Sequence, residues 1–362
     1  MGSDADIKVG IIGCGSVATV AHVPGYQKVP GAEIIALCDI DIERARTWSE
    51  KLGAAGCYSD YREMFKNHKL DVVSVATPPS SHADATIVSL EAGANVICEK
   101  PMAMNPEESE RMVEAAERTG KLLTIGCDFR CWEGSRLLKK IIERGDLGHI
   151  FYARAICTGK TEEGLHGSNI ILRREFAGGG ILFCTTVHPI DLAYWLMGSP
   201  DVESVYAMTY TRAHKMKKPP LIWERPPADI DVEDFVSALA KFDNDSAMLI
   251  ETYWFSDTDQ KTPFIELKGD KGTAIFERGT STLEVWAENE DGDIVDVSPT
   301  GLPIFMDSEL IAFEIAEFIE AVRTGGKPHV LGREAINVQR ILSGVNDSGA
   351  SGREKIYAPL SS

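Results

Sequence analysis

The sequence predicts a two-domain α/β protein. A doubly wound parallel sheet is expected over residues 1–126, and an α/β domain with a mostly antiparallel sheet and helices on one face over residues 127–362. In the first third, short β-branched runs alternate with helical periodicity, which is typical of a parallel sheet with crossover helices. A glycine-rich turn follows the first run. After about residue 127, turns rich in Gly, Asn and Asp join the strands, which favours hairpins.

The first domain is built from short apolar runs. Buried strands are predicted over residues 8–12, 33–38, 72–76, 95–98 and 122–125. A helix over residues 106–119 is well punctuated, because Asn105 can cap it, Pro106 takes its first position, Glu108 completes a capping box and Gly120 ends it.

The second domain begins with an amphipathic helix over residues 134–144. The predicted strands cover residues 150–157, 202–210, 232–242, 247–254, 264–268, 273–276 and 283–287, and two helices over 307–323 and 334–348 finish the fold. Residues 215–227 contain four prolines and are predicted to form a loop. Together with residues 158–174, this loop is expected to set substrate specificity.

The charge and the cysteines limit the classes of function. A formal net charge of -18 and a pI near 4.9 argue against nucleic acid or an anionic membrane as partner and favour a small polar substrate. No apolar run is expected to approach the length of a membrane span. Eight cysteines show no CxxC pair and no zinc-ligand spacing, which predicts reduced thiols, no metal site and a cytoplasmic location.

The glycine-rich turn has the GxGxxA form of a dinucleotide-binding loop. Its first glycine permits a tight turn, its second allows backbone N–H groups to approach a pyrophosphate, and its final alanine permits close helix packing. A plain glycine turn is the alternative. The predicted contacts are Gly13, Gly15, Ser16, Val17 and Ala18.

Further cofactor contacts are predicted after the following strands. Asp39 ends the second strand, where its carboxylate would bind ribose hydroxyls and repel a 2′-phosphate, so NAD is favoured over NADP. Asp39 could also cap the next helix. Thr77 and Pro78 could line the cofactor cleft through their backbone, with His82 either beside them or an ordinary first-turn helix residue.

Lys100 is the strongest catalytic candidate. It follows the apolar strand over residues 95–98 in the sequence Glu99-Lys100-Pro101, at the strand end where nicotinamide and substrate would meet in a doubly wound sheet. Glu99 and Lys100 are therefore also placed beside the cofactor. The alternative is a solvated lysine at a strand end.

These motifs, in this order, make the chain similar to the Gfo/Idh/MocA family of oxidoreductases (glucose-fructose oxidoreductase, inositol dehydrogenase and MocA). The similarity extends over nearly the whole chain and adds the glycines at 178–180, the motif at 269–272 and residues 348–352. It implies a Rossmann domain, and a C-terminal α/β domain whose large open sheet often forms the subunit interface, hence a homodimer or homotetramer. It also implies pyranoside or polyol substrates that are oxidised or reduced with NAD(P).

The resemblance also directs attention to the segment after the three glycines. Family members commonly carry Asp four residues before the active-site His, but this chain has Cys184 before His188. His188 is predicted to be the base, since an unperturbed imidazole has a pKa of about 6.5, with Lys100 donating a hydrogen bond to the same oxygen. A helix kink before Pro189 is the alternative for His188. Asp191, one turn further on, is expected mainly to support its helix.

Two other side chains are weaker candidates for substrate contact. Arg130 could bind substrate or pyrophosphate through its fork of donors, but an interdomain ion pair is an equally simple interpretation. Trp254, with Trp132 and Tyr253, could stack on a sugar ring, although aromatic residues in strands usually belong to the core. Cys184 is most often a small buried hydrophobe in such a setting.

The leading hypothesis is therefore an NAD-dependent dehydrogenase or reductase. It would move a hydride to or from a secondary alcohol of a sugar, sugar derivative or cyclitol, with Lys100 and His188 as its polar centre. One alternative is an NAD-recycling glycosidase of the same fold. Another is a non-catalytic NAD-binding sensor, because Cys184 replaces the carboxylate expected from the family.

Overall fold

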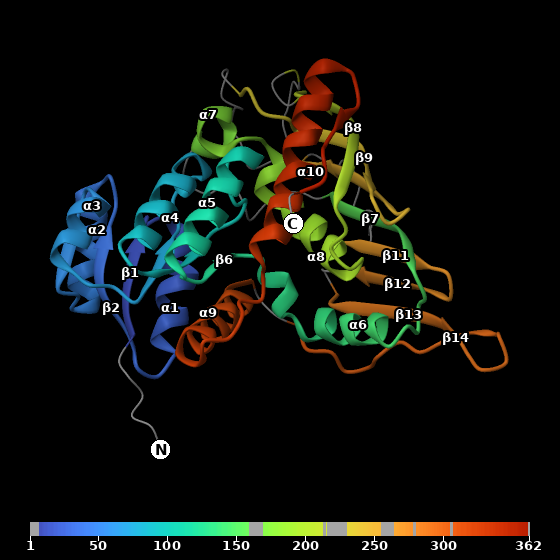
Figure 1. The fold of residues 1–362 in the computed structure, drawn as a ribbon, viewed down its shortest axis with the longest axis horizontal. Helices are drawn as coiled ribbons and strands as arrows, with labels where there is room; N and C mark the ends of the chain where they lie inside the picture. The colour runs from blue at the N-terminus through green and yellow to red at the C-terminus, as the bar shows by residue number, and fades with distance from the viewer. Residues whose placement is uncertain are drawn as a thin grey trace. The chain divides into compact units, whose positions relative to one another are not determined.

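The chain forms two compact units (Figure 1), seen in a computed structural model. The structure describes residues 7–158, 169–212, 215, 230–254, 264–277, 280–304 and 307–360. Unit 1 comprises Met1–Cys131 and Met306–Ile336, and unit 2 comprises Trp132–Phe305 and Asn337–Ser362. The sequence suggested one boundary after residue 126, whereas in the structure a late segment of the chain returns to the first unit.

Unit 1 contains a fully parallel sheet, as the sequence predicts. In the described part of the chain it has six strands in the order β3-β2-β1-β4-β5-β6. Their bounds are β1 (Ile7–Ile12), β2 (Ala32–Cys38), β3 (Gly56–Tyr58), β4 (Val72–Val75), β5 (Asn95–Cys98) and β6 (Leu123–Ile125). The edge strand β3 was not predicted, because three half-buried residues give no periodic signal.

The helices of unit 1 connect these strands or, in the case of η3 and α9, follow the last of them. They are η1 (Ala18–His22, a π-helix), α1 (Val23–Gln27), α2 (Ile42–Leu52), α3 (Tyr61–Asn67), η2 (Pro79–Ser81), α4 (His82–Glu91), α5 (Pro106–Thr119), η3 (Asp128–Cys131) and α9 (Asp307–Thr324). The predicted capping of α5 is confirmed. The Asn105 side chain accepts from the Glu108 N–H at 2.9 Å, the Glu108 carboxylate accepts from the Met104 N–H at 3.1 Å, and Gly120 ends the helix with φ +65°.

Helix α9 explains why the late segment belongs to unit 1. Its residues Ile315, Phe318 and Ile319 are at most 1% exposed and lie in the same apolar cluster as Val9 and Ile11 of β1. A strand that is buried on both faces needs an apolar cover on each of them. Periodicity predicts such a helix but does not show which sheet it covers.

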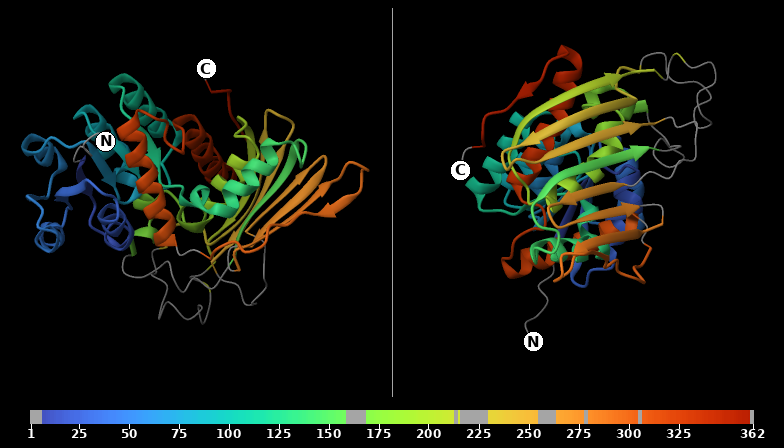
Figure 2. Two further views of the ribbon diagram at one scale, coloured as in Figure 1. Left: turned by 90° about the horizontal axis from the view of Figure 1, so that it is seen from below. Right: turned by 90° about the vertical axis from the view of Figure 1, so that its right-hand side faces the viewer.

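Unit 2 contains the second predicted sheet, which is mostly antiparallel (Figure 2). Among the described residues its order is β14-β13-β12-β11-β7-β10-β9-β8-β15, and the β7–β10 pair is parallel. The strands are β7 (Ile150–Thr158), β8 (Val202–Tyr210), β9 (Phe235–Phe242), β10 (Ala247–Tyr253), β11 (Ile265–Gly269), β12 (Gly272–Glu277), β13 (Thr282–Glu288), β14 (Ile294–Asp296) and β15 (Lys355–Ile356). The short strands β14 and β15 were not predicted.

The helices of unit 2 include α8, which packs on β7 and β11. They are α6 (Glu133–Glu143), η4 (Asn169–Leu172), α7 (Arg174–Ala177), η5 (Leu182–Thr186, a π-helix), α8 (Val187–Leu196) and α10 (Gly332–Ser351). Gly344 and Gly349 of α10 lie so close to Val205 and Thr209 of β8 that an added Cβ would be 2.9 Å and 2.5 Å away. The glycines therefore let the helix backbone approach the sheet.

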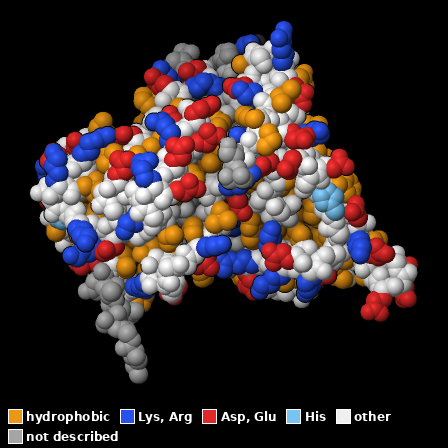
Figure 3. Space-filling model, viewed as in Figure 1, with side chains coloured by type: hydrophobic (Ala, Val, Ile, Leu, Met, Phe, Trp, Pro, Cys, Tyr) orange, Lys and Arg blue, Asp and Glu red, His pale blue; other side chains and the backbone are white. Residues whose placement is uncertain are grey.

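The opposite face of the sheet carries exposed apolar side chains. Tyr206, Met208 and Tyr210 alternate along β8, and Leu239 pairs with Tyr206 from β9; each is 37–51% exposed in the single chain. On the molecular face shown in Figure 3, acidic and basic side chains are interspersed.

The expectation that no apolar run approaches a membrane span is wrong by length and composition, because one segment of unit 2 among the described residues is long and apolar enough. It is Arg174–Leu196, and 78% of its apolar window is buried inside the protein. Burial of this kind is typical of a core helix. The segment packs on β7 and β11 through α8.

Loops 215–227 and 158–174, which were predicted to set specificity, lie largely outside the described residues.

Candidate functional site

The carboxyl ends of the parallel strands in unit 1 gather most of the predicted cofactor residues. Strand order reverses between β1 and β4, which makes this edge the topological switch point where doubly wound sheets bind ligands. Gly13 follows β1, Asp39 follows β2, Thr77 lies just beyond β4, and Lys100 lies just beyond β5. The sheet therefore brings these residues to one edge.

The glycine loop has the geometry that a bound pyrophosphate requires. Gly13 has φ +93°, and a Cβ there would lie 2.4 Å from the Ala76 carbonyl oxygen, so only glycine fits. At Gly15 a Cβ would meet nothing within 4 Å. The second glycine therefore leaves open space over the loop, at the start of the first helical segment, where a phosphate can approach backbone N–H groups. The loop fits a dinucleotide.

The Asp39 side chain fixes the glycine loop through a hydrogen bond to its backbone. Its carboxylate accepts from the Cys14 N–H at 2.7 Å and from the Asp41 N–H at 2.9 Å, and it is 8% exposed. The cap of α2 is Asp41, which accepts from the Glu43 N–H, so the capping role considered for Asp39 belongs to its neighbour. Burial first, and the charge of Asp39 second, raise the pKa of the Cys14 thiol to about 12. That thiol is therefore neutral.

His82 ties two of the edge loops together. It is fully buried, and its ring nitrogens lie 2.8 Å from the Thr77 carbonyl oxygen and 2.9 Å from the Pro101 carbonyl oxygen. Burial lowers the pKa of His82, and the two carbonyl oxygens act against that shift. The ring therefore supports the loops after β4 and β5, and a direct cofactor contact by His82 stays a prediction.

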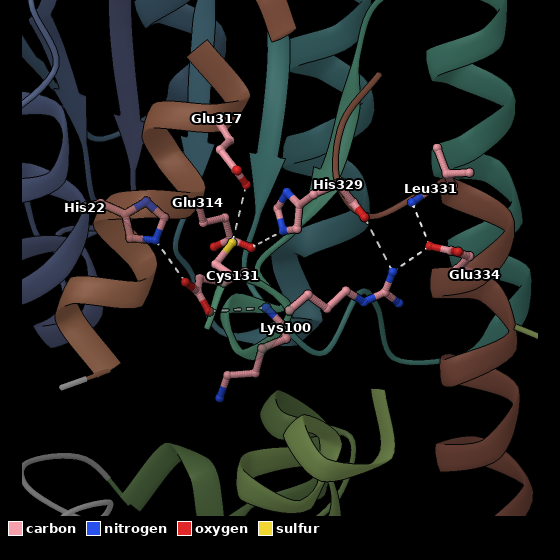
Figure 4. A network of polar contacts seen from close by, with 10 residues as sticks. His22, Lys100, Cys131, Glu314, Glu317, His329, Leu331 and Glu334 are labelled. Carbon is pink, nitrogen blue, oxygen red and sulfur yellow. Dashed lines mark hydrogen bonds and ion pairs between the residues drawn. The ribbon is translucent and has the colours of Figure 1, made fainter. Parts of the chain in front are cut away.

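The backbone N–H of Lys100 is hydrogen-bonded to the buried carboxylate of Glu99. The Glu99 side chain accepts from the Lys100 backbone N–H at 3.2 Å and from His22 Nε2 at 2.9 Å (Figure 4). Burial raises the pKa of Glu99, but the hydrogen bond and charge of His22 and the charge of Lys100 outweigh it and lower the pKa to about 2. Glu99 is therefore ionised. Sequence reasoning missed His22, whose one visible signal is a histidine in the otherwise apolar helix after the glycine loop.

Arg130 forms an ion pair within unit 1. Its side chain is 1% exposed, and its guanidinium lies 2.6 Å from the Glu334 carboxylate and donates to the His329 carbonyl oxygen (Figure 4). Arg130 therefore forms an ion pair, but the predicted interdomain pairing is wrong, because both partners belong to unit 1. Contact of Arg130 with a substrate stays a prediction.

The glycines at 178–180 allow Glu233 to approach the backbone of the following helical segment closely. A Cβ on Gly180 would lie 1.9 Å from the Glu233 carbonyl oxygen, and the Glu233 carboxylate accepts from the Gly180 N–H at 2.6 Å. The carboxylate also pairs with Arg174 at 3.2 Å, and burial raises its pKa despite that partner. Glu233 therefore anchors the segment that leads to His188.

The helical segment that carries Cys184 and His188 changes from a π-helix to an α-helix. Cys184 lies in the π-helical turn η5, and α8 begins at Val187, where Pro189 withholds an N–H from the hydrogen-bond ladder. Cys184 and His188 are half-buried. Cys184 packs against an apolar cluster that includes Trp254.

The remaining candidates of unit 2 are buried. Asp191 is 2% exposed and Trp254 is 1% exposed. Burial favours the core interpretation of Trp254 and the supporting role of Asp191, and their contact with substrate stays a prediction. Lys100 belongs to unit 1 and His188 to unit 2, so the joint action of these two residues also stays a prediction.

A parallel sheet with a glycine loop at its switch point and a lysine at a neighbouring strand end defines the class of protein as a nicotinamide-dependent oxidoreductase. Comparison with known proteins agrees. Residues 7–127 match the model of an oxidoreductase family with an NAD-binding Rossmann fold, and residues 135–275 match the GFO/IDH/MocA C-terminal domain. The chain belongs to the Gfo/Idh/MocA family, whose members act on CH–OH groups with NAD(P).

Named relatives indicate the range of the family. The chain is 32% identical to D-glucoside 3-dehydrogenase of Escherichia coli (strain K12) over 76% of its own length and 78% of the relative. It is 27% identical to myo-inositol 2-dehydrogenase of Thermotoga maritima over 91% and 92% of the two chains. The fold is similar to that of levoglucosan dehydrogenase in complex with NADH and levoglucosan, with a TM-score of 0.82, 24% identity and coverage of 97% and 99%.

Proposed function

We propose that this protein is an NAD-dependent dehydrogenase or reductase that acts on a secondary alcohol of a sugar, sugar derivative or cyclitol. The observation that carries the proposal is Lys100, which follows β5 at the switch-point edge and whose backbone is fixed by an ionised carboxylate. Relatives named as glucoside and inositol dehydrogenases support the substrate class.

The chemistry divides between the cofactor and the chain. A bound nicotinamide supplies the hydride acceptor or donor. Lys100 donates a hydrogen bond to the substrate oxygen and stabilises the negative charge that develops there. His188 takes the hydroxyl proton during oxidation and returns it during reduction. Gly13 and Gly15 leave the loop backbone free to hold the pyrophosphate.

NAD is proposed over NADP because of Asp39. Its carboxylate accepts hydrogen bonds from two backbone N–H groups, and a negative charge there would repel a 2′-phosphate. Arg44 lies 3.9 Å from this carboxylate and weakens the repulsion only in part, because its side chain is 55% exposed. Titration calorimetry with NAD+ and NADP+ is expected to show tighter binding of NAD+.

A panel of sugars and cyclitols, assayed with NAD+ for NADH formation, tests the activity. Lys100→Met is expected to bind NAD+ with near wild-type affinity and to lose turnover on any substrate found. If Lys100→Met retained turnover, or lost cofactor binding together with turnover, the role assigned to Lys100 would be refuted. Stoichiometric release of NADH excludes the NAD-recycling glycosidase.

The presence of Cys184 in place of a carboxylate favours a second candidate function, that of a non-catalytic NAD-binding sensor. The thiol is a poor replacement for a carboxylate that would bind a substrate hydroxyl, and it packs against an apolar cluster. Under this candidate the wild type shows no turnover on the panel, and Cys184→Asp gains it. Turnover by the wild type excludes the sensor.

Assembly and location complete the proposal. We propose a homodimer or homotetramer formed through the exposed apolar face of the large sheet, which carries Tyr206 and Leu239. Light scattering is expected to give a dimer or tetramer mass, and Leu239→Lys a smaller one. The eight cysteines, whose spacing shows no CxxC pair, support a cytoplasmic location.

A further inference from the structure

A chain of buried polar groups lies behind Lys100 in unit 1. Tyr26 Oη is 2.7 Å from Ser74 Oγ, Ser74 Oγ is 3.0 Å from His22 Nδ1, and His22 Nε2 is 2.9 Å from Glu99 Oε1. His22 and Ser74 are fully buried, Tyr26 is 1% exposed and Glu99 is 6% exposed. Buried polar groups are costly unless they are paired, and each of these four is paired.

The ionised state of Glu99 determines the direction of the hydrogen bonds among these four residues. An ionised Glu99 carboxylate can only accept, so Nε2 carries a hydrogen; if the imidazole is neutral, Nδ1 then accepts from Ser74 Oγ, and Tyr26 donates to Ser74. If the imidazole is protonated, both ring nitrogens carry hydrogen. In either state Nε2 donates to Glu99. The other carboxylate oxygen accepts from the Lys100 N–H, so Glu99 connects His22 to the lysine.

This chain of buried polar groups does not provide a path for protons to reach solvent. Its far end, Tyr26, lies in the core cluster that also contains Phe318 of α9. A proton path needs an end that reaches water, and Tyr26 is 1% exposed. A chain that is closed at one end can fix a geometry and a charge, but it cannot carry protons away.

The groups that act on Glu99 are few among the described residues. His22, Lys100 and His82 lower the pKa of Glu99, and burial raises it. The charge of Glu314 on α9 raises the pKa of Tyr26, at the other end of the polar chain. Gly126, after β6, leaves room for the carboxylate, since a Cβ there would lie 3.3 Å from Oε1. His22 is the one of these groups that donates a side-chain hydrogen bond to Glu99.

We propose that His22 is a positioning residue for Lys100, which acts by holding the Glu99 carboxylate ionised and fixed against the Lys100 backbone. The inference rests on the proposed function, because Lys100 is the group that meets the substrate. If His22 is replaced by an apolar residue, burial is no longer offset by the hydrogen bond. Glu99 then takes up a proton near neutral pH and releases the lysine backbone.

Two substitutions at one position separate this role from a purely structural one. His22→Leu removes the donor, whereas His22→Gln keeps an N–H donor in reach of Glu99. For each variant, kcat relative to wild type is measured as a function of pH. With His22→Leu this ratio is expected to fall about tenfold as the pH is lowered from 8 to 6. With His22→Gln and with Glu99→Gln it is expected to be independent of pH.

Infrared difference spectroscopy reports on the pair without any substrate. A protonated carboxyl band is expected near neutral pH in His22→Leu, and not in wild type or in His22→Leu/Glu99→Gln. Absence of the band in His22→Leu overturns the proposal even if no activity is ever found. A band together with a pH-independent kcat ratio overturns it as well, because the carboxylate would then not serve Lys100. Failure of the proposed function alone leaves the infrared result standing.

Discussion

Gly15→Ala separates cofactor binding from folding more sharply than any other change in the glycine loop. An added Cβ at Gly15 would meet no heavy atom within 4 Å, and Gly15 does not have a positive φ. The free energy of unfolding should therefore stay within about 1 kcal/mol of wild type. The new methyl group would occupy the space over the loop N–H groups, where the proposal places the pyrophosphate.

The expected loss of affinity follows from the hydrogen bonds at stake. A hydrogen bond between a backbone N–H and a charged phosphate contributes about 1.5–3 kcal/mol. If the methyl group displaces the phosphate from one such bond, the Kd for NAD+ should rise about 10- to 150-fold. Calorimetric titration of NAD+ measures the affinity, and urea unfolding measures the stability.

Gly13 and Gly53 provide matched comparisons. Both have positive φ, +93° and +67°, so alanine at either position costs about 1–2 kcal/mol in strain. At Gly53 a Cβ meets nothing within 4 Å, whereas at Gly13 it would collide with the Ala76 carbonyl oxygen. Gly13→Ala should therefore be less stable than Gly53→Ala by about 2 kcal/mol or more, and Gly53→Ala should bind NAD+ normally. A folded Gly15→Ala variant with wild-type affinity for NAD+ would refute the placement of the pyrophosphate.

Three further predictions concern stability, each measured by chemical denaturation. The pKa of Glu99 is about 2 in the folded chain and near 4.5 when unfolded, so the free energy of unfolding of the wild type should fall by roughly 3 kcal/mol as the pH drops from about 4.5 to 2. Glu99→Gln should lack this acid-dependent loss of stability. If the variant kept the acid dependence of the wild type, Glu99 would not be ionised in the folded protein. Arg130→Met should cost about 3 kcal/mol, since it leaves the Glu334 carboxylate without its guanidinium partner, and a cost below about 1 kcal/mol would show that the pair is dispensable. Gly180→Ala should cost about 2–4 kcal/mol because its Cβ would lie 1.9 Å from the Glu233 carbonyl oxygen, and wild-type stability in that variant would rule out the close approach.

Local patterns in the sequence sufficed for the sheets and for most of their elements. The strand over residues 95–98 and the helix over residues 106–119 were predicted with their observed bounds, because an apolar run and a complete set of capping residues are each contained in a short stretch of chain. Strands of two or three residues, such as β15, carry too little periodicity to be recognised. The place of α9 depends on a partner about 300 residues away, which no local pattern encodes.

The residues of the candidate site also fall into those that the sequence predicts and those that it does not. Residues at strand ends, such as Gly13, Asp39 and Lys100, were predictable because topology alone carries them to one edge of the sheet. The support beneath Lys100 was not predictable, since the contact between His22 and Glu99 joins residues 77 positions apart through packing. A histidine inside an apolar helix gives the same local signal whether it is a spectator or a partner.

The energetics of the buried pair argue for a role in the reaction rather than in the fold. A buried hydrogen-bonded pair that contains a charged group is often no more stable than apolar side chains of the same shape, because the cost of desolvation offsets the attraction between the partners. Unit 1 already buries two large apolar clusters around its strands, so His22 and Glu99 are not needed to form its core. The pair does one thing that an apolar replacement cannot do, which is to hold an ionised carboxylate against the backbone N–H of Lys100. That effect is felt at the strand end where the proposed chemistry takes place.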